Sequence, residues 1–408
     1  MSLQSIYAAR PAGPASDAQE PTTGLPAWTY RSAELTDLEY QRVILPSWQF
    51  ACHVNEVKAA GDYVTLDLGR DSIVVTRDKA GSLQAFKNVC RHRGARLLDG
   101  SGSCPGAIVC PYHGWSYALD GKLFSVPNAE AFPGLDEAAH GLLAVEHEIF
   151  HGLVFVRVAE GGPSLKEMWG DYGALLAPYG IEDMEPVGGS WSETWKCNWK
   201  VAVDNNLENY HIPLGHPGYH RMLDNDLEGF MNAYGVAGST SVLRDKPSRN
   251  WVERMYQELA PDALDHLDEE TRRTWIFFSM PPNIGVDIYP DSFDVFQILP
   301  LDAETCVARA CVYARPGSGR EERLLQYLNQ RINRQVGYED QELCERVQQG
   351  LAAHGYEPGP LATLESGVRD FHDRIRAAVP ATTIDEEPAP GTLAALNEDL
   401  LSEQRAAS

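Results

Sequence analysis

Two short segments of the sequence each combine a cysteine with a histidine. Cys90 and His92 form C-x-H, and after seventeen intervening residues Cys110 and His113 form C-x-x-H. Each pair places a thiolate and an imidazole on one tight loop. Two such loops can hold a metal centre from opposite sides. The spacing therefore predicts a metal site in which each loop supplies one sulfur and one nitrogen ligand.

A structural zinc ion of the Cys₂His₂ type is one interpretation of these four residues. Zinc-finger spacing groups cysteine with cysteine and histidine with histidine, whereas each loop here mixes the two. Two cysteines on one iron and two histidines on the other are the ligands of a Rieske [2Fe–2S] cluster, which we expect instead. Cys104 lies between the loops and is expected to be a bystander thiol.

A second set of candidate ligands lies further along the chain. His211 and His216 are separated by a segment containing Pro213, which should break a helix and turn His216 back toward His211. Two imidazoles and one carboxylate form the facial triad that leaves open positions on Fe(II). The alternative is a pair of ordinary buried histidines. His220 is expected in the pocket wall or a loop.

The carboxylate of this triad should come from a distant helix. Asp340 continues an apolar stripe, where an acidic side chain is costly unless it is paired. Glu339 borders the same face, so periodicity alone does not choose between them. Glu208 lies three residues before His211 and would share a helical face with it. The stripe consists of Leu325, Leu328, Ile332, Val336, Leu343, Val347 and Leu351.

Short strands and one long helix must position these residues. Runs at 63–68, 72–76 and 150–156 predict a small antiparallel β domain around the Cys/His loops. The second half mixes strands with the long helix that carries the stripe. Its predicted strands are 275–278, 293–298 and 306–313.

Composition limits the class of protein. The net charge of −24 argues against a nucleic-acid surface. It is typical of a well-solvated protein, or else of an acidic docking face for a redox partner. The sequence contains no run of about 18 apolar residues, so we expect no membrane-spanning helix. Eight cysteines in 408 residues do not indicate a disulfide scaffold, so we expect a soluble, cytoplasmic protein.

The chain divides into four predicted segments. An N-terminal arm and helix cover 1–40, with a mobile, Pro- and Ala-rich stretch at 8–27. The cluster domain covers 41–160, and the second metal site belongs to a domain at 161–380. An acidic, loose tail is expected at 381–408.

The segments Cys90-Arg91-His92-Arg93-Gly94 and Cys110-Pro111-Tyr112-His113-Gly114-Trp115 resemble the Rieske motifs of ring-hydroxylating-type oxygenases. The resemblance implies an α+β fold, with a β-rich Rieske domain followed by a helix-grip catalytic domain. It also implies one [2Fe–2S] cluster and one mononuclear Fe(II) that activates O₂. No G-x-G-x-x-G fingerprint is present, so a separate NAD(P)H-dependent reductase with flavin or iron–sulfur centres is expected.

The same resemblance assigns two acidic residues. The segment around Asp340 is similar to the family's C-terminal ligand segment, which selects Asp340 over Glu339. Glu208 stands where the family has an acid that bridges the first iron histidine to a Rieske histidine of the neighbouring chain. By that resemblance Glu208 would join His211 to His113 of the partner subunit. A head-to-tail contact of this kind must close, most simply as a homotrimer.

We expect the substrate to be a small molecule. Glu208 and the C-terminal segment resemble the carnitine, choline and betaine members, which suggests N-demethylation of a betaine- or carnitine-like quaternary ammonium compound. The rival is ring hydroxylation or O-demethylation of an aromatic acid, for which Arg221, Arg244 and Lys246 would be carboxylate ligands. A pure electron-carrier ferredoxin is a remote alternative, because a carrier needs no open iron site. Candidates for a cation–π cage are Tyr219, Phe230, Tyr234, Trp251, Trp275 and Phe277.

Overall fold

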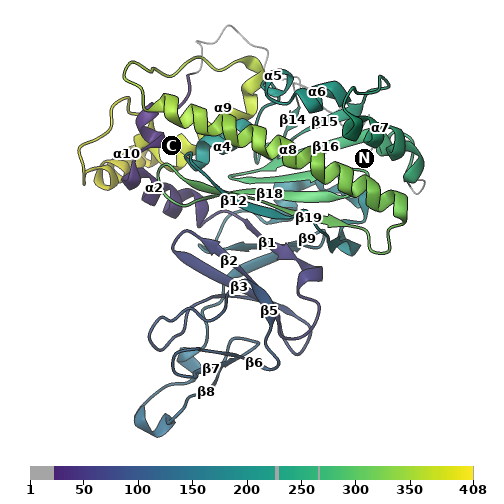
Figure 1. The fold of residues 1–408 in the computed structure, drawn as a ribbon. Coiled ribbons are helices and arrows are strands. Elements are labelled where there is room, and N and C mark those ends of the chain that lie inside the picture. The colour runs from purple at the N-terminus through teal and green to yellow at the C-terminus, as the bar shows by residue number, and fades with distance from the viewer. Residues whose placement is uncertain (1–22, 226–228, 265–266, 408) are drawn as a thin grey trace. The chain divides into compact units, whose positions relative to one another are not determined.

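The computed structural model describes residues 23–225, 229–264 and 267–407, which form two compact units (Figure 1). The smaller unit comprises Leu45–Leu165 with Ile181–Pro186, and the larger unit takes the rest of the described chain. Among these residues no helix is long and apolar enough to cross a bilayer. Most of the predicted arm at 8–27 lies outside the described residues.

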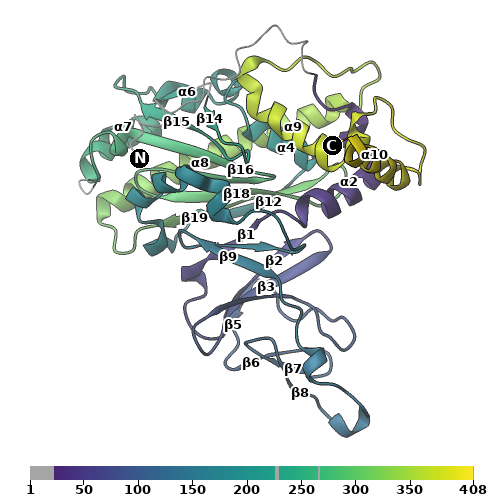
Figure 2. The ribbon, with the colours of Figure 1, turned by 180° about the vertical axis from the view of Figure 1, so that it is seen from behind.

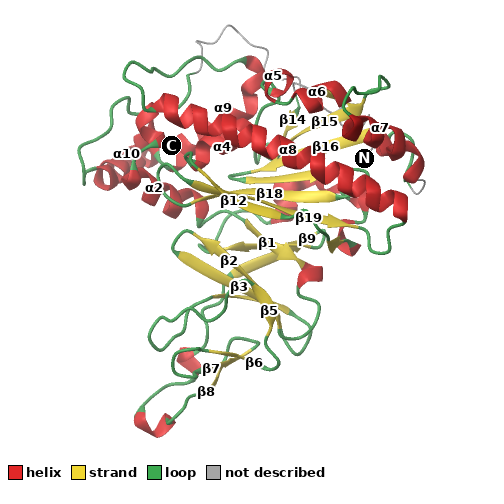
Figure 3. Ribbon diagram, in the orientation of Figure 1, coloured by secondary structure: helices red, strands yellow, loops and turns green. Residues whose placement is uncertain are grey.

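Three small antiparallel sheets build the smaller unit, with strand orders β1-β10-β9, β4-β3-β2-β5 and β6-β7-β8 (Figure 3). The strands predicted at 63–68 and 72–76 are confirmed as β2 and β3. The strands are β1 (Gln49–His53), β2 (Asp62–Leu68), β3 (Asp71–Arg77), β4 (Leu83–Lys87), β5 (Ser101–Ser103), β6 (Ala107–Val109), β7 (Ser116–Ala118), β8 (Leu123–Ser125), β9 (Glu146–Phe150) and β10 (Leu153–Arg157).

The prediction of one continuous strand at 150–156 is wrong. His151 and Gly152 have φ of 47° and 78°, and they form the two-residue turn between β9 and β10. Positive φ at both central residues matches the right-handed twist of a tight hairpin. A Cβ at Gly152 would lie 2.6 Å from His53 Nε2, so the close packing also favours glycine.

An antiparallel sheet dominates the larger unit, in the order β19-β18-β17-β16-β15-β13, with β12 beside β19 and β14 beside β15. The three strands predicted in this half are confirmed as β16, β18 and β19. The strands are β12 (Trp191–Trp195), β13 (Leu223–Asn225), β14 (Phe230–Met231), β15 (Ala237–Leu243), β16 (Thr274–Met280), β17 (Ile284–Ile288), β18 (Phe293–Pro300) and β19 (Cys306–Ala314).

The long predicted helix is confirmed as α8 (Arg320–Leu351), which lies along one face of this sheet in both views (Figures 1 and 2). Leu325, Leu328 and Ile332 are buried as expected, but Val347 is 51% exposed. The buried face rotates because the second half of α8 packs on α4, where Asn198 N–H donates to Gln348 Oε1. The other helices are α2 (Ala33–Glu39), α3 (Leu165–Trp169), α4 (Trp199–Asn206), α5 (Ile212–Gly215), α6 (Pro217–Met222), α7 (Trp251–Ala263), α9 (Ser366–Ala378) and α10 (Leu393–Ala407).

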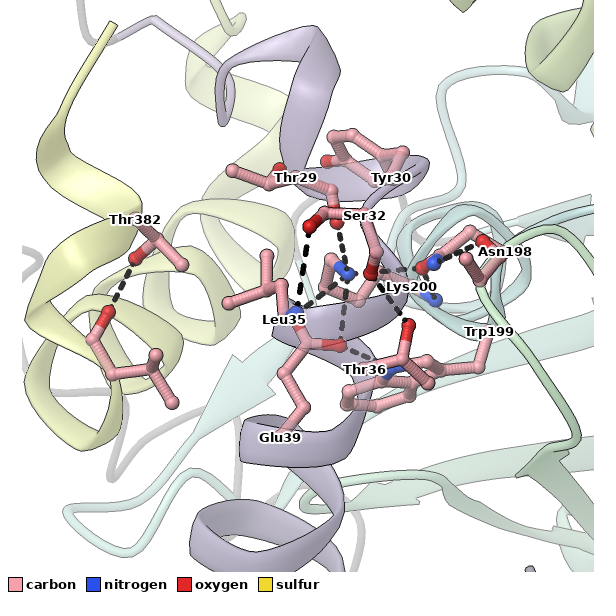
Figure 4. Close-up of polar contacts among 12 residues, drawn as sticks. Thr29, Tyr30, Ser32, Leu35, Thr36, Glu39, Asn198, Trp199, Lys200 and Thr382 are labelled. Atoms are coloured by element: carbon pink, nitrogen blue, oxygen red, sulfur yellow. Dashed lines mark hydrogen bonds and ion pairs between the residues drawn. The ribbon is translucent and has the colours of Figure 1, made fainter. Parts of the chain in front are cut away.

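A buried ion pair joins the N-terminal helix α2 to α4 (Figure 4). Lys200 Nζ lies 2.7 Å from Glu39 Oε1, and both side chains are almost completely buried. The same ammonium donates to the carbonyl of Thr29, while the Trp199 indole donates to Glu39. These contacts make the described part of the segment before residue 45 a component of the larger unit.

The prediction of a loose tail after residue 380 is wrong. Pro380–Thr383 form a 3-10 helix and Leu393–Ala407 form α10. Leu393 belongs to the core and Leu400 packs against it, so α10 packs on the larger unit. The backbone N–H of Ala381 also donates to the buried Asn397 side chain.

Candidate functional site

The two Cys/His loops of the smaller unit have the same backbone geometry. In each loop the cysteine N–H donates to the carbonyl five residues later, and the glycine N–H four residues after the cysteine returns to the cysteine carbonyl. Gly94 and Gly114 both have φ of 72°, a left-handed conformation that favours glycine. The repeated turn presents Cys90 and Cys110 in equivalent settings, as expected for ligands on opposite sides of one centre.

The side chains of these loops suit a bound metal cluster. Cys90 and Cys110 are buried, and the His92 and His113 rings lie 4.8 Å apart. His92 Nδ1 is buried with no hydrogen-bond partner among the described residues. A buried nitrogen without a hydrogen-bond partner is unfavourable, and a metal bond would satisfy it. Burial, followed by His113 and Arg93, lowers the pKa of His92, so its imidazole is neutral and free to coordinate.

A single zinc ion fits these four residues less well than a two-iron cluster does. In the described part of the chain, the group of three or more ligand atoms that converge within 4.8 Å lies elsewhere, at His211, His216 and Asp340. Cysteine and histidine ligands shared between two irons need not converge on one point. Cys104 lies in a different turn, where its N–H donates to Gly61.

Aromatic side chains complete this site, and sequence reasoning missed two of them, Tyr117 and Phe132. Trp115 stacks on His92 at 4.9 Å, and the Phe132 ring meets both rings edge-on. The Tyr117 hydroxyl lies 3.3 Å from Cys90 Sγ and accepts the Arg91 N–H. Burial raises the pKa of Tyr117, so the hydroxyl stays neutral and can donate to the sulfur. Tyr117 lies on β7, only two residues after Trp115, and this closeness to the second Cys/His motif could have indicated it in the sequence.

The second set of ligands converges in the larger unit. His211 Nε2 lies 3.0 Å from His216 Nε2, and Asp340 Oδ1 lies 2.9 Å from His216 Nε2 and 3.7 Å from His211 Nε2. Three ligand atoms thus face one point, as a facial triad requires. Burial would lower the pKa of His216, but Asp340 and Glu339 together raise it.

The chain reaches this geometry in a different way from the one predicted. Pro213 lies in the first turn of α5, where its missing N–H is not needed. The helix breaks instead at His216, directly before Pro217. Glu208 lies in the loop after α4 rather than on a helical face shared with His211.

Each histidine ring also contacts a carboxylate through Nδ1, on the side away from the point where the Nε2 atoms converge. Glu208 Oε1 lies 2.6 Å from His211 Nδ1, and Glu208 Oε2 accepts the His211 backbone N–H. Glu339 Oε2 lies 2.9 Å from His216 Nδ1. Such contacts fix the ring orientation and leave the opposite nitrogen for a metal. The structure therefore places Asp340 at the point of convergence and Glu339 behind it. Asn205, which the sequence did not indicate, donates to Asp340 Oδ1 at 2.7 Å.

A cavity of about 130 Å³ opens beside the triad. Of the predicted cage residues, Tyr219 and Phe277 line it; Trp275 is buried behind them, and Tyr234 and Trp251 are exposed on the surface. Arg221, Arg244, Lys246 and His220 line a different cavity. The aromatic residues of the lining are Trp191, Tyr219, Phe277, Phe278, Tyr289 and Phe296.

Two acidic residues that sequence reasoning missed also line this cavity. Asp287 and Asp294 are opposite each other on β17 and β18. Burial, with the neighbouring carboxylates, raises the pKa of Asp287, and burial raises the pKa of Asp294 to about 7. In the sequence, what could have indicated these two residues is the single acidic residue within each of two otherwise apolar strands. Among the described residues, no Lys or Arg lines the cavity.

The sequence matches two protein families. Residues 47–140 match the Rieske [2Fe-2S] domain, and residues 182–381 match the ring hydroxylating alpha subunit (catalytic domain). The carnitine monooxygenase oxygenase subunit of Acinetobacter pittii is 30% identical over 81% of this chain and 87% of its own length. The glycine betaine monooxygenase oxygenase subunit of Chromohalobacter salexigens is 28% identical over 86% of this chain and 84% of its own.

A solved structure shares the fold. The quaternary ammonium Rieske monooxygenase CntA, in complex with its substrate L-carnitine, superposes with a TM-score of 0.73. The match covers 88% of this chain and 96% of that chain at 24% identity. At this identity the likeness concerns the fold alone.

Proposed function

Because the chain belongs to the Rieske oxygenases with a ring-hydroxylating-type alpha-subunit catalytic domain, we propose that it N-demethylates a quaternary ammonium compound. Proteins of this family contain one [2Fe–2S] cluster and one mononuclear iron. The observation that carries the proposal is the cavity beside the triad, which combines aromatic walls with carboxylates and, in its described lining, has no Lys or Arg.

The geometry of the two sites supports an assignment of the residues that would hold the two metal groups. Cys90 and Cys110 would bind one iron of the cluster, and His92 and His113 the other. The two imidazoles of the triad and Asp340 would hold the mononuclear iron. When bound there, Fe(II) supplies the open positions at which O₂ is activated beside a substrate.

The protein itself orients the side chains of the triad and excludes water from the space in front of them. Glu208 and Glu339 fix the two imidazoles, and Asn205 holds the Asp340 carboxylate at 2.7 Å. Aromatic rings surround the space in front of the triad, which favours a desolvated methylammonium group.

The overall reaction balances with two electrons from a separate NAD(P)H-dependent reductase and two protons from the solvent. One oxygen atom of O₂ enters an N-methyl C–H bond and gives an N-hydroxymethyl group. This group loses formaldehyde as its C–N bond breaks, and the tertiary amine leaves with one proton. The second oxygen atom leaves as water.

Electron delivery would use Glu208 as a bridge to the partner subunit's His113, within a homotrimer. Two features support this role. The Glu208 carboxylate contacts His211 and also lines a second cavity, where Leu343 and the exposed Val347 offer an apolar docking surface. In the smaller unit, the His113 side chain and the neighbouring Tyr112 are exposed.

The aromatic-acid alternative is less well supported. A carboxylate substrate needs a cationic partner, but the candidate cations line another cavity, and Arg221 there is paired with Glu253 at 2.7 Å. An electron-carrier ferredoxin would have no use for the converging triad of the larger unit.

A peroxide-driven reaction tests the proposal, because peroxide supplies both oxygen and electrons without the reductase. Iron-loaded protein is offered choline, glycine betaine, carnitine, benzoate and a methoxybenzoate, and formaldehyde and hydroxylated products are measured together. Formaldehyde with the matching tertiary amine supports the proposal. A ring-hydroxylated acid, or formaldehyde from the methoxybenzoate alone, refutes it in favour of the aromatic branch.

A further inference from the structure

We propose that Asp287 and Asp294 bind the cationic head of the substrate and select a substrate with net positive charge over a zwitterion. This inference rests on the proposed function and narrows its substrate class. It concerns the wall of the cavity formed by β17 and β18, and no metal ligand is part of it.

The strand register brings the two carboxylates together. Asp287 and Asp294 are direct partners in the antiparallel pair β17–β18, so their side chains leave the same face of the sheet. Both line the cavity that the iron triad faces. Asp294 is 6% exposed, and its Oδ2 accepts a hydrogen bond from the Tyr289 hydroxyl at 3.1 Å. Within the described chain, its other oxygen and the whole Asp287 carboxylate have no hydrogen-bond partner.

A purely structural role would require more partners than the single Tyr289 hydroxyl that this pair has. Asp291, in the turn between the same strands, accepts hydrogen bonds from Tyr256, Ser292 and Asn329. Asp291 is thus a fully satisfied buried acid and does not line the cavity. Two like charges directly opposite on neighbouring strands are destabilising. The Asp287 carboxylate and one oxygen of Asp294 thus face the cavity without a partner in the described chain, and a ligand from outside the chain would complete them.

The charge balance of the cavity favours a cation. Its described lining has four carboxylates, from Glu208, Asp287, Asp294 and Asp340, and no Lys or Arg. With all four carboxylates ionised, the two charges of an Fe(II) ion would leave the lining two negative charges in excess. Burial raises the pKa values of Asp287 and Asp294, and a cation bound beside them would lower those pKa values and favour their ionised forms.

The same balance disfavours a substrate carboxylate. The positive head of a betaine would meet the aspartates, but its carboxylate would find no Lys or Arg in the described lining to pair with. Choline has the same trimethylammonium head and a neutral hydroxyl instead. The walls near the pair carry Tyr219, Phe277 and Tyr289, whose rings can face the methyl groups of such a head.

Equilibrium binding tests this selection on the iron-loaded full-length protein. Calorimetry compares choline with glycine betaine and with 3,3-dimethylbutan-1-ol, the uncharged carbon analogue of choline. We expect choline to bind at least about 30-fold more tightly than the neutral analogue, as a desolvated charge contact implies. Equal affinity for choline and its neutral analogue would overturn the proposal without any variant.

Substitutions then locate the effect. Asp287→Asn and Asp294→Asn should each weaken choline binding by about 30-fold and leave the neutral analogue unchanged. Asp287→Glu retains the charge and should restore most of the affinity. Asp302→Asn, an exposed acid in the β18–β19 turn, is the matched control and should bind choline as the wild type does. The cluster absorbance and iron content confirm folding of each variant.

The outcomes separate this inference from the proposed function. Formaldehyde production with an unchanged KM for choline in Asp287→Asn would refute the aspartate site and leave N-demethylation standing. Charge-dependent choline binding with no formaldehyde from any quaternary amine would support the site and refute the demethylase assignment.

Discussion

Replacing Glu339 tests whether it positions His216 or binds the iron itself. Glu339 and Asp340 are adjacent on α8, but Asp340 Oδ1 faces His216 Nε2 and Glu339 Oε2 faces His216 Nδ1. Asp340→Ala removes one of three ligands and should release the mononuclear iron. Glu339→Ala removes only the hydrogen bond that orients the ring, so iron should still bind.

The size of the Glu339 effect follows from that contact. A 2.9 Å hydrogen bond between an imidazole and a carboxylate belongs to the stronger class, worth about 1.5–3 kcal/mol. Loss of such a partner typically weakens metal binding about 10–100-fold. We therefore expect Glu339→Ala to lower the affinity for Fe(II) within that range.

Competition with a calibrated Fe(II) chelator measures the affinity, and the cluster absorbance checks that the smaller unit stays intact. Glu342→Ala is the matched control, because Glu342 lies on the same helix but is 65% exposed and paired with Arg346. Complete iron loss in Glu339→Ala with iron retained in Asp340→Ala would refute this assignment and exchange the two roles.

Three further substitutions test other contacts. His211→Ala should keep the visible spectrum of the cluster but abolish turnover; retained turnover would contradict the iron site. Glu208→Gln should leave both metals bound but slow single-turnover reaction from the reduced cluster about 10–100-fold, and an unchanged rate would rule out the bridge. Glu39→Gln leaves the buried Lys200 without its counter-charge and should lower the free energy of unfolding by about 3–5 kcal/mol in denaturant titrations. Glu39→Gln with Lys200→Met should lose less than Glu39→Gln alone, and an equal or larger loss would argue against coupling of the pair.

The net charge of the chain does not tell which acidic residues line the cavity beside the triad. The chain has many acids and a net charge of −24, yet the binding of a cation depends on two residues whose importance comes from strand register. A shift of one residue between β17 and β18 would place their side chains on opposite faces.

The sequence by itself determined the cluster loops, the helix α8 and most strands. Each Cys/His pair lies within one short turn, so spacing alone brings its ligands together. A repeat of apolar residues likewise defines α8 without knowledge of its neighbours. The same local reasoning failed where packing decided the outcome, as at Val347, where contact with α4 rotates the buried face.

Only the tertiary structure decided which groups meet across long separations. Glu339 and Asp340 differ by about 100° around the helix axis, and periodicity did not separate them. The packing of α8 against α5 and α6 turns Asp340 toward both histidines and Glu339 behind one of them. Arg221, Arg244 and Lys246 were plausible substrate ligands until the fold placed them in another cavity. A sequence records which groups are present, but distances between remote residues arise only when the elements pack.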